Sequence, residues 1–561
     1  MPIRHASRPG PAPGVRFPPQ AEVDFVVIGS GAAGGVLAKE LSGAGFSVVV
    51  LEQGPYLRPA DFRHDELGGF FNFDLLPRPN DFPTTFRKTE QDEATVQAFP
   101  PSVMYAKLVG GSSVHFTANY WRFRPIDFVE RSRIGPIPGT GFADWPITYD
   151  DLEPYYTKVD WEVGVSGAPG YGDPARSRPY PMPPLPVKSS GALLEYGARK
   201  LGLHPSPAPM AILSRPHNNR TNCIHCGFCM FFGCEVGAKS SSLASMIPLA
   251  EATGRCEIRP ESTAFNIETN AAGRVTRVLY WDQDGREQAQ RAKAVVLSAN
   301  GAETARLLLL SASSRFPDGL ANSSGKVGKH LMLNGYCTAY GQFEHPLNEY
   351  KSVQVTRVVM DYYDTDPARG CYGGGGMDSR FDFYPAMFGL NGLPGDAPQW
   401  GSEYKRMLAE YYTHTMAVAG HATSLPLETN SISLDPKVKD KYGRPALRLT
   451  YKDHPDDLKI LRFFQDRSKE LLEAAGARRV WANPVQEQNV AVHLLGTCRM
   501  GTDPRESVVD KYHRAHDVRN LFICDGSSFV TSGRGQPTMT IQALAFRAAD
   551  HIVQFARRNE I

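Results

Sequence analysis

The most regular pattern of apolar and polar positions lies at residues 24–54, near the start of the chain. DFVVIG, at residues 24–29, is a short run rich in β-branched side chains and predicts a buried parallel strand. Val36, Leu37 and Leu41 then recur at the spacing of one helix face, and SVVVLE predicts a second strand. The three segments together predict a strand–helix–strand unit of about thirty residues.

Three glycines follow the first strand in the spacing Gly29-x-Gly31-x-x-Gly34. Gly29 permits a tight turn, Gly31 lets the backbone approach a pyrophosphate, and Gly34 lets helix and strand pack closely. The helix N-terminus around Ala32 and Ala33 offers N–H groups and a partial positive charge to phosphates. The motif therefore predicts a dinucleotide site, and a merely glycine-rich turn is the alternative.

Two further segments indicate which dinucleotide is bound. Glu52 ends the second strand, where a carboxylate can accept hydrogen bonds from a ribose diol. NLFICDG, near the end of the chain, predicts a buried strand that ends in Asp525 and Gly526, and an amphipathic helix follows it. This arrangement fits a flavoprotein, in which the first and last segments jointly enclose FAD. We therefore expect FAD rather than a nicotinamide cofactor, with Asp525 at its ribityl or pyrophosphate portion.

Residues 335–484 carry a different pattern, of short alternating runs such as YCTAYGQF, NSISLDP and PALRLTYK. This alternation predicts an antiparallel sheet, and DDLKILRFFQDRSKELLEAAGA predicts a long helix beside it. The glycine-rich segment GCYGGGGMDSRFDFYPAMFGLNGLPG is expected to form a loop or a strand edge over a pocket. His421, in AGHATSLP, could face that pocket, but a surface or core position is the more ordinary expectation.

Composition narrows the class of protein. The 561 residues include 61 basic and 59 acidic side chains, a net charge of +2, so no general field attracts nucleic acid or an anionic membrane. No run of eighteen apolar residues occurs, and no membrane span is expected. The first twenty residues contain Arg and Pro without an apolar centre, which predicts a flexible or surface-bound arm and no export signal.

Four of the nine cysteines fall within twelve residues, at Cys223, Cys226, Cys229 and Cys234. Their close spacing and the lack of an export signal disfavour disulfides. Two successive CxxC steps could hold a zinc ion, but the spacing is closer to that of an iron–sulfur cluster, either 3Fe-4S or 4Fe-4S. Metal-free thiols are the third alternative. The other five cysteines are scattered along the chain, and their neighbours suggest that several are small core residues.

Six segments, in order along the chain, resemble the glucose–methanol–choline (GMC) oxidoreductase family. They are GSGAAGG, KLVGGSSVHFTANYWRFRPIDF, AVVLSANGAETARLLLLS, GKVGKHLMLN, HLLGTCRMGTDP and the closure from Asp525 to Pro537. The resemblance implies an α/β protein with a discontinuous Rossmann-like FAD domain and an α+β substrate domain. It also implies oxidation of a CH–OH group by hydride transfer to flavin N5. The cysteines and VGGSSVHFT look like the large subunits of bacterial sugar, glucoside and gluconate dehydrogenases, in which a cluster would relay single electrons.

The resemblance also implies which residues surround the flavin. Gly110, Gly111 and Ser112 belong to a loop that the family places against the cofactor. His115 matches the histidine that pyranose oxidases bond covalently to flavin. A covalent bond at His115 and a histidine that only lines the pocket both remain open.

The catalytic base implied by the family is His493, which stands before GTCRMG. A histidine can take the hydroxyl proton near neutral pH while hydride leaves the carbon. Gln536 stands where the family usually has Asn or His, and it can orient the hydroxyl but cannot titrate. Pro537 and Thr538 are expected near the flavin pyrimidine edge, where Thr538 and nearby N–H groups could stabilise reduced flavin.

The predicted domains are an arm at 1–20, an FAD domain at 21–130, 240–334 and 490–556, a connecting and cysteine region at 131–239, and a substrate domain at 335–489. The leading hypothesis is an FAD dehydrogenase of a sugar, glycoside or related alcohol, with electrons leaving through the cluster to a cytochrome or quinone. A cluster-free alcohol or pyranose oxidase and a non-redox flavin lyase are the alternatives. A small companion subunit could supply an export signal, so we expect a cytoplasmic enzyme, or a periplasmic one exported with that partner.

Overall fold

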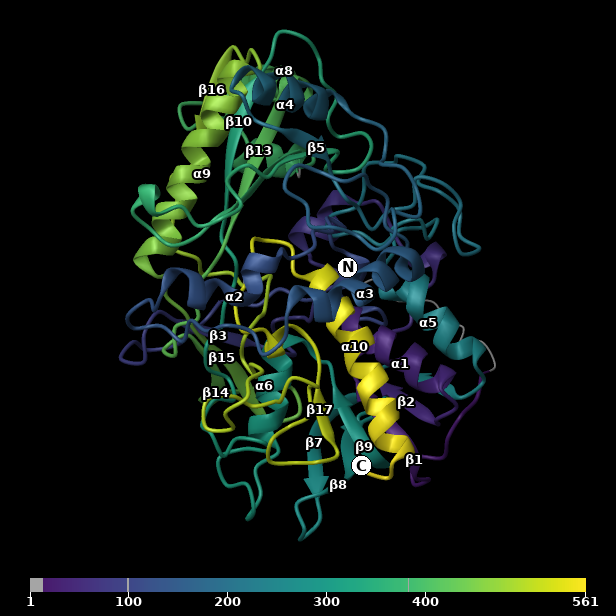
Figure 1. The fold of residues 1–561 in the computed structure, drawn as a ribbon. Coiled ribbons are helices and arrows are strands. Elements are labelled where there is room, and N and C mark those ends of the chain that lie inside the picture. Colours follow the sequence, from purple (N-terminus) through teal and green to yellow (C-terminus); the bar gives the residue numbers. More distant parts are fainter. Residues whose placement is uncertain (1–13, 98–99, 382) are drawn as a thin grey trace.

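The computed structural model describes residues 14–97, 100–381 and 383–561 (Figure 1). Residues 1–13 of the predicted arm lie outside the described residues. The N–H of Phe17 donates to the Glu257 carboxylate at 2.7 Å, and its carbonyl accepts from Arg259 at 3.0 Å. The end of the arm is thus tied to strand β6 (Cys256–Arg259). Within the described ranges, no helix combines the length and apolar character needed to cross a membrane.

A seven-stranded sheet forms the lower half of the molecule in Figure 1. Its order is β6 (Cys256–Arg259), β2 (Val48–Leu51), β1 (Val23–Ile28), β9 (Glu287–Leu297), β8 (Val275–Trp281) and β7 (Thr263–Thr269), with β17 (Leu521–Ile523) also paired to β9. The pairs β6–β2, β2–β1, β1–β9 and β9–β17 are parallel, which confirms the α/β prediction. Helix α1 (Ala32–Gly43) connects β1 to β2 and packs against α5 (Ser242–Ala252) and α10 (Thr538–Arg557).

A six-stranded sheet forms the core of the upper half (Figure 1). Its order is β16 (Arg479–Ala482), β10 (Tyr336–Gln342), β13 (Thr415–Ala422), β12 (Gly375–Arg380), β11 (Arg357–Val359) and β5 (Pro205–Pro207). Every neighbouring pair is antiparallel, as predicted for this region. Of the runs quoted for the prediction, YCTAYGQF forms β10 of this sheet, whereas NSISLDP and PALRLTYK form an antiparallel pair in another sheet. The predicted long helix is α9 (Pro455–Ala474), which packs on β10 and β13.

The glycine-rich segment at residues 370–395 differs from the prediction. It does not form only a loop or a strand edge, because β12 is an internal strand between β13 and β11. A Cβ atom on Gly375 would lie 1.7 Å from the carbonyl oxygen of His421. Only glycine allows two backbones to come this close, and glycines without side chains hide a strand from an analysis of alternating polarity.

A third, four-stranded sheet lies in the lower half of Figure 1. It contains β14 (Ser431–Lys439), β15 (Pro445–Thr450), β3 (Thr84–Arg87) and β4 (Thr95–Val96), and β15 runs parallel to β3. This sheet pairs the predicted substrate domain with the predicted FAD domain. Strand β5 likewise comes from the predicted connecting region. The domain boundaries therefore stay a prediction, since the sheets cross two of them.

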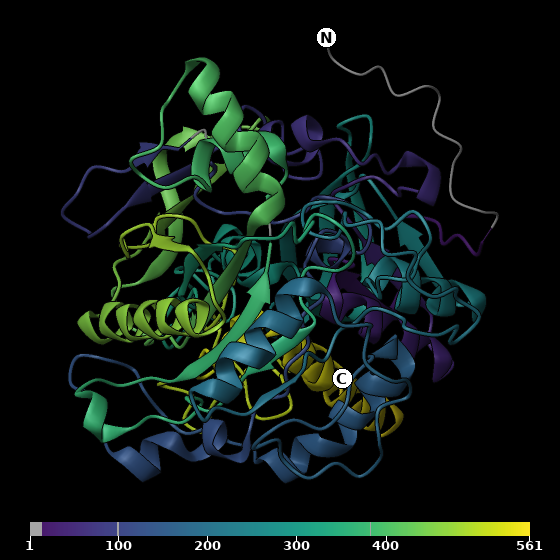
Figure 2. The same cartoon turned by 90° about the horizontal axis from the view of Figure 1, so that it is seen from above.

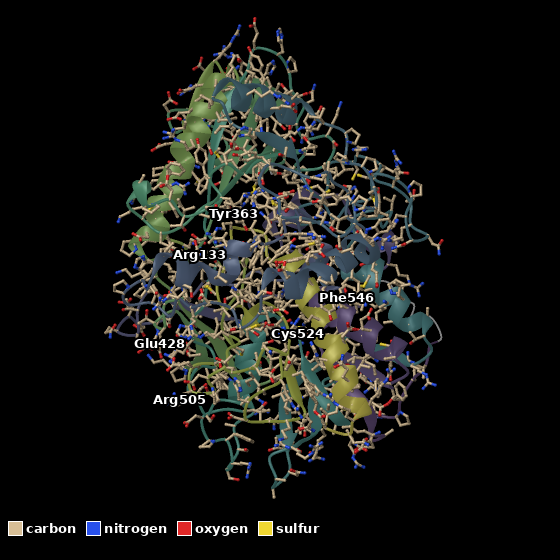
Figure 3. All side chains as sticks on the ribbon, in the orientation of Figure 1. Arg133, Tyr363, Glu428, Arg505, Cys524 and Phe546 are labelled. Carbon is tan, nitrogen blue, oxygen red and sulfur yellow. The ribbon has the colours of Figure 1, made fainter. Side chains whose placement is uncertain are left out.

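The remaining helices surround these sheets. They are α2 (Pro125–Ile134), α3 (Tyr149–Val159), α4 (Ser189–Lys200), α6 (Asn300–Leu310), α7 (Pro385–Asn391) and α8 (Gly401–His414). Figure 2 shows α8 (green) and α9 (yellow-green) at the outer edge of the molecule. Cys256, Cys337, Cys498 and Cys524 are buried, which confirms core positions for scattered cysteines. Figure 3 shows Cys524 in the interior and Arg505 at the periphery.

Candidate active site

A cavity of about 910 Å³ lies between the two large sheets. Residues at the carboxyl ends of β1, β2 and β9 line one side, and residues of β10, β12 and β13 line the other. Ligands of open α/β sheets bind at the carboxyl ends of the strands. The volume lies in the upper part of the usual range for ligand sites, about 300–1,000 Å³. The cavity is therefore the candidate site for both cofactor and substrate.

The glycine loop after β1 forms one wall of this cavity. Gly29, Gly31, Ala32 and Ala33 line it, while Gly34 lies behind them. Gly29 has a φ of +93°, and a Cβ atom there would lie 2.4 Å from the carbonyl oxygen of Ser298, the residue after β9. A Cβ atom on Gly34 would lie 2.0 Å from the Gly29 carbonyl oxygen. The loop thus brings bare backbone and the N-terminus of α1 to the cavity, as a pyrophosphate requires.

Glu52 lines the cavity at the end of β2. Its carboxylate accepts from the Ser30 N–H at 3.1 Å, from the Ser30 hydroxyl at 2.7 Å and from the Gly54 N–H at 3.0 Å. Burial raises the pKa of Glu52, although these bonds and Lys107 oppose the shift. The bonds fix the carboxylate where an adenosine ribose can reach it.

The predicted flavin loop packs directly on the glycine loop. Gly110 and Gly111 have φ values of +96° and +54°, and the Gly110 N–H donates to the Ser30 hydroxyl at 3.0 Å. Ser112 and His115 line the cavity beyond them. Burial and the nearby charge of Lys239 lower the pKa of His115 to about 3, so its imidazole is neutral near pH 7. Covalent attachment at His115 stays a prediction.

The closing segment reaches the same cavity from the other end of the sequence. Asp525 and Gly526, after β17, line it. The Asp525 carboxylate accepts from the Thr304 hydroxyl at 2.6 Å and from the Ser527 N–H at 2.8 Å. Burial raises the pKa of Asp525, opposed by these bonds. The first and last segments thus meet at one cavity, which only the long-range fold can bring about.

The reactive end of the cavity gathers the remaining predicted residues. His493, Gln536, Pro537 and Thr538 all line it. Helix α10 begins at Thr538 with Pro537 as its N-cap. The positive end of a twenty-residue helix therefore lies at the cavity, where it favours a developing negative charge.

The ring of His493 is kept neutral by its surroundings. Burial, together with the charges of His421 and Arg380, lowers the pKa of His493 to about 4. Its Nδ1 atom is buried and has no hydrogen-bond partner among the described residues. A neutral ring with an unused nitrogen can accept a proton, as a general base must.

The sequence offered His421 as a residue that could face the pocket, but it did not reveal the polar cluster that this histidine forms beside His493. His421, on β13, lines the cavity and does not occupy a surface position or a purely structural core position. Its Nε2 atom lies 2.9 Å from Asp378 Oδ2, and Asp378 forms a buried ion pair with Arg380 at 2.6 Å. Burial alone would raise the pKa of Asp378, but Arg380 and His421 hold it below its usual range. The side chain of Asn119 donates to the same carboxylate at 2.9 Å.

A signal for this cluster was present in the sequence. Asp378 and Arg380 are two residues apart, so on a strand they share one face. The glycines before them conceal the strand, and with it the shared face.

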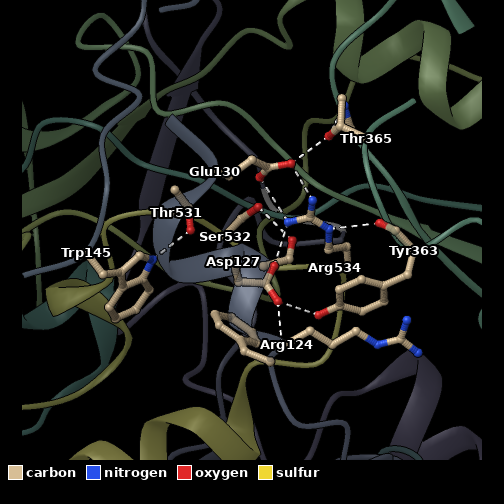
Figure 4. A network of polar contacts seen from close by, with 12 residues as sticks. Arg124, Asp127, Glu130, Trp145, Tyr363, Thr365, Thr531, Ser532 and Arg534 are labelled. Carbon is tan, nitrogen blue, oxygen red and sulfur yellow. Dashed lines mark hydrogen bonds and ion pairs between the residues drawn. The ribbon is translucent and has the colours of Figure 1, made fainter. Parts of the chain in front are cut away.

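The loop that carries Gln536 is held by Arg534, a fully buried arginine that the sequence did not single out (Figure 4). Its guanidinium forms ion pairs with Asp127 and Glu130 of α2, and one of its terminal nitrogens lies 3.0 Å from Glu130 Oε2. Its Nε atom donates to the Tyr363 carbonyl at 2.9 Å. The Tyr363 hydroxyl donates to Asp127 at 2.6 Å. These bonds fix the loop to α2, and Figure 4 shows the arginine enclosed by its partners.

The cysteine loop lies against the flavin loop. Met230 and Phe231 line the cavity, and the Phe231 N–H donates to the His115 carbonyl at 2.7 Å. The buried Lys239 donates to the carbonyls of Cys229 and Phe116, at 2.6 and 3.1 Å, and so ties the two loops together. The cysteines are therefore close in space to the cofactor side of the cavity.

The predicted metal site is not supported by the placement of the cysteine side chains. In the part of the chain that the structure describes, no group of three or more His, Cys, Asp or Glu residues is placed to hold a metal ion. Cys226 is exposed, Cys229 is buried, and Cys223 and Cys234 are intermediate. Burial raises the pKa of Cys229 to about 12 and that of Cys223 to about 11.

Comparison with known proteins decides the family. The chain matches a GMC oxidoreductase description over residues 184–334 and again over 426–545, and an NAD(P)-binding Rossmann-like domain over 27–78. It is 34% identical over 558 residues to the 2-methyl-1,2-propanediol dehydrogenase of Mycolicibacterium austroafricanum, covering 95% of each chain. The chain belongs to the GMC oxidoreductase family.

One further relative agrees with this membership, and a solved structure shows the same fold. The chain is 31% identical to the fructose dehydrogenase large subunit of Gluconobacter japonicus, over 94% of this chain and 97% of that one. The fold is similar to that of pyridoxine 4-oxidase from Mesorbium loti, with a TM-score of 0.64 at 17% identity over 94% of this chain and 98% of the other. Dehydrogenases and an oxidase thus share the architecture.

The cavity fits the cofactor that GMC membership supports. FAD needs a bare-backbone cradle for its phosphates, a carboxylate for its ribose and a donor-rich site for its ring system. The glycine loop, Glu52 and the N-terminus of α10 supply these groups around one continuous cavity. The flavin loop and Asp525 complete the wall between them. FAD and a CH–OH group as the site of oxidation are the assignments that the family supports.

Proposed function

We propose that the chain is an FAD-dependent dehydrogenase that oxidises a CH–OH group of a polyol or sugar, with His493 as the base. The observation that carries the proposal is the meeting of His493, Gln536 and the N-terminus of α10 in the cavity that holds the glycine loop. When bound, FAD supplies the hydride acceptor. His493 takes the hydroxyl proton, the hydride carries the electron pair away from the carbon, and a carbonyl group is left.

The lining of the cavity supports a substrate with several hydroxyl groups. Polar side chains line it beside the aromatic ring of Tyr340, namely Asn391, Gln465, Asn483, Gln486 and Gln488. Amides can both donate to and accept from hydroxyl groups. The named substrates of the two relatives, a vicinal diol and a ketohexose, have this character. We therefore place polyols and ketoses first among candidate substrates.

The decisive experiment is an anaerobic screen of alcohols against the FAD-loaded protein. The loss of flavin absorbance reports reduction by each alcohol. We expect bleaching by 2-methyl-1,2-propanediol, D-fructose or a related polyol. His493→Asn should keep FAD bound and slow the bleaching by about 10²–10⁴-fold, the usual contribution of a general base. An unchanged rate in that variant would exclude His493 as the base. Bleaching by none of the alcohols would refute the proposed function.

The electron acceptor follows from the same preparation. The two named dehydrogenase relatives support an artificial dye, cytochrome or quinone over oxygen, and the relative called a large subunit supports a companion subunit. The spacing of the cysteines favours an electron exit at residues 223–234, but their side chains do not form a metal site. We therefore assign no electron step to an iron–sulfur cluster. If the purified protein contains stoichiometric iron and acid-labile sulfide, the assignment of an iron–sulfur cluster is restored. If the reduced protein rapidly forms peroxide with oxygen, the enzyme is an oxidase.

A further inference from the structure

Gln536 contacts one titratable side chain of the upper sheet. Its amide nitrogen lies 3.3 Å from Nδ1 of His421. Gln536 has no ionisable proton of its own, so its behaviour at the reactive end of the cavity depends on what holds its amide. Its Oε1 atom has no hydrogen-bond partner among the described residues.

The protons of this contact can be assigned from its chemistry. An amide NH₂ group only donates, so Nδ1 of His421 must be the acceptor. A neutral imidazole then carries its single proton on Nε2, which lies 2.9 Å from Asp378 Oδ2 and donates to it. Arg380 stays on the same carboxylate, with Nε 2.6 Å from Oδ1 and a terminal nitrogen 2.6 Å from Oδ2. A terminal nitrogen of Arg380 also lies 2.9 Å from Nε2 of His421, and Arg380 can only donate. With the proton on Nε2, both side chains donate to Asp378 Oδ2, Arg380 at 2.6 Å and His421 at 2.9 Å, and neither donates to the other.

Protonation of the His421 ring would reverse the direction of its hydrogen bond with Gln536. If Nδ1 gains a proton, it becomes a donor and needs the amide oxygen, so the Gln536 amide must turn over. The amide nitrogen has two hydrogens. When one is held by neutral His421, the other remains to donate to an oxygen in the cavity. This orientation suits a hydroxyl oxygen whose proton is being taken by His493.

We propose that His421 is a positioning residue that sets which end of the Gln536 amide meets the substrate hydroxyl, and that Asp378 holds the ring for this role. The proposal rests on the proposed function for its consequence in catalysis, while the contact itself can be tested without substrate. The neutral ring gives the productive orientation. Protonation of His421 removes it, in addition to the protonation of His493 that blocks the base.

The charged and titratable groups that face His421 come from three elements. Asp378 and Arg380 lie on β12, and Tyr336 on β10 is paired with His421 across the sheet. His493 is close enough for the two rings to influence each other. Asp378 and Arg380 both lie 2.9 Å from Nε2 of His421. The pH dependence therefore belongs to the cluster and not to an isolated ring.

The contact is tested by nitrogen NMR of protein labelled with ¹⁵N-histidine, with the His421 signal identified by its loss in His421→Gln. We expect the neutral tautomer with the proton on Nε2, and a clear shift of the Nδ1 resonance in Gln536→Leu. The surface pair of His204 and Asp361, 2.6 Å apart, is the matched control, and its signals should not move. A proton on Nδ1 in the neutral ring, or no shift in Gln536→Leu, would overturn the proposal.

The catalytic consequence is tested by the pH profile of anaerobic flavin reduction by 2-methyl-1,2-propanediol and D-fructose. His421→Gln should retain FAD and lower the rate of flavin reduction by roughly ten- to a hundredfold. On the acidic side of its pH profile, the rate should fall with one protonation instead of the two seen in the wild type. His204→Gln should keep both. If His421→Gln does not fold, His421→Ala is used instead. Added imidazole should then restore part of its rate of flavin reduction and the second protonation on the acidic side of the pH profile. A lower rate with an unchanged limb would contradict the positioning role. If neither alcohol reduces the wild-type flavin, the proposed function fails, and the NMR result still decides the contact.

Discussion

At the scale of single residues, His493 combines two properties that a base in a flavin site requires. Burial and the nearby His421 and Arg380 keep its ring neutral, because each disfavours the imidazolium form. Its unpartnered Nδ1 shows that the described chain leaves one nitrogen unused. A neutral ring can therefore take the hydroxyl proton while the hydride leaves the carbon for the flavin.

The lowered pKa of His493 gives a prediction for pH dependence. A base must be unprotonated, so the rate of flavin reduction should be constant above the pKa and fall as the pH drops below it. With the pKa of His493 at about 4, the base itself should limit the rate only in strongly acidic buffer. Anaerobic stopped-flow reduction across the pH range of stability measures this limb. In His421→Gln, where only this protonation should remain, a midpoint near the ordinary histidine value of about 6.5 would contradict the burial of the ring.

At the scale of elements, the sequence predicted the helices and strands whose apolar spacing is visible within one short segment. The strand–glycine–helix unit at residues 24–54 appears as β1, α1 and β2, because its apolar spacing and glycines act locally. Strand β12 was missed because consecutive glycines carry no polarity. The cluster around His421 and the anchor at Arg534 were missed for a different reason. Both depend on contacts between segments far apart in the chain, and no single segment shows them.

The close approach of β12 to β13 predicts a strong effect of one methyl group. In Gly375→Ala, the new Cβ would meet the His421 carbonyl oxygen at 1.7 Å, so one strand must move. We expect a loss of about 1–3 kcal/mol in the free energy of unfolding and slower flavin reduction, since His421 moves with the strand. Gly43→Ala is the control, because a Cβ there has no neighbour within 4 Å. Equal stability of the two variants in denaturant unfolding would show that the strands separate at no cost.

The buried Arg534, which holds the loop before Gln536, gives a second prediction for stability. Arg534→Met removes the cation between Asp127 and Glu130 and leaves two buried carboxylates unpaired. Removing one partner of such a buried pair costs about 3–5 kcal/mol. The thermal midpoint should therefore fall and FAD affinity should weaken, because the loop leads into Gln536 and α10.

Arg505→Met is the matched control for this experiment. Arg505 pairs with Asp503 at 2.7 Å, but its side chain is 86% exposed, so the thermal midpoint should not change. Thermal unfolding with the fluorescence of released FAD reports both effects in one measurement. Similar midpoints for the two variants would mean that Arg534 does not hold the loop.

At the scale of the whole molecule, the cavity lies where two sheets of different construction face each other. The parallel strands of the seven-stranded sheet present bare backbone and helix N-termini, which suit phosphates. The antiparallel sheet presents side chains, including His421 and Arg380, which suit a small polar substrate. Each half therefore supplies one kind of recognition, and neither half contains the complete site. The sequence predicted the first half well because its chemistry lies in a local motif.

The cysteine loop raises the last question at this scale, which is how electrons leave. Because the four thiols are not placed around a metal, we expect Cys226→Ser to leave iron content, flavin reduction and dye reduction unchanged. Cys226 is exposed, so the substitution should not disturb packing, and Cys371→Ser in the upper half is the control. Reduced enzyme is mixed with dye or with oxygen, and the return of flavin absorbance is followed. Normal flavin reduction with lost dye reduction in Cys226→Ser alone would show that electrons leave through this loop and that the thiols gather around a cluster.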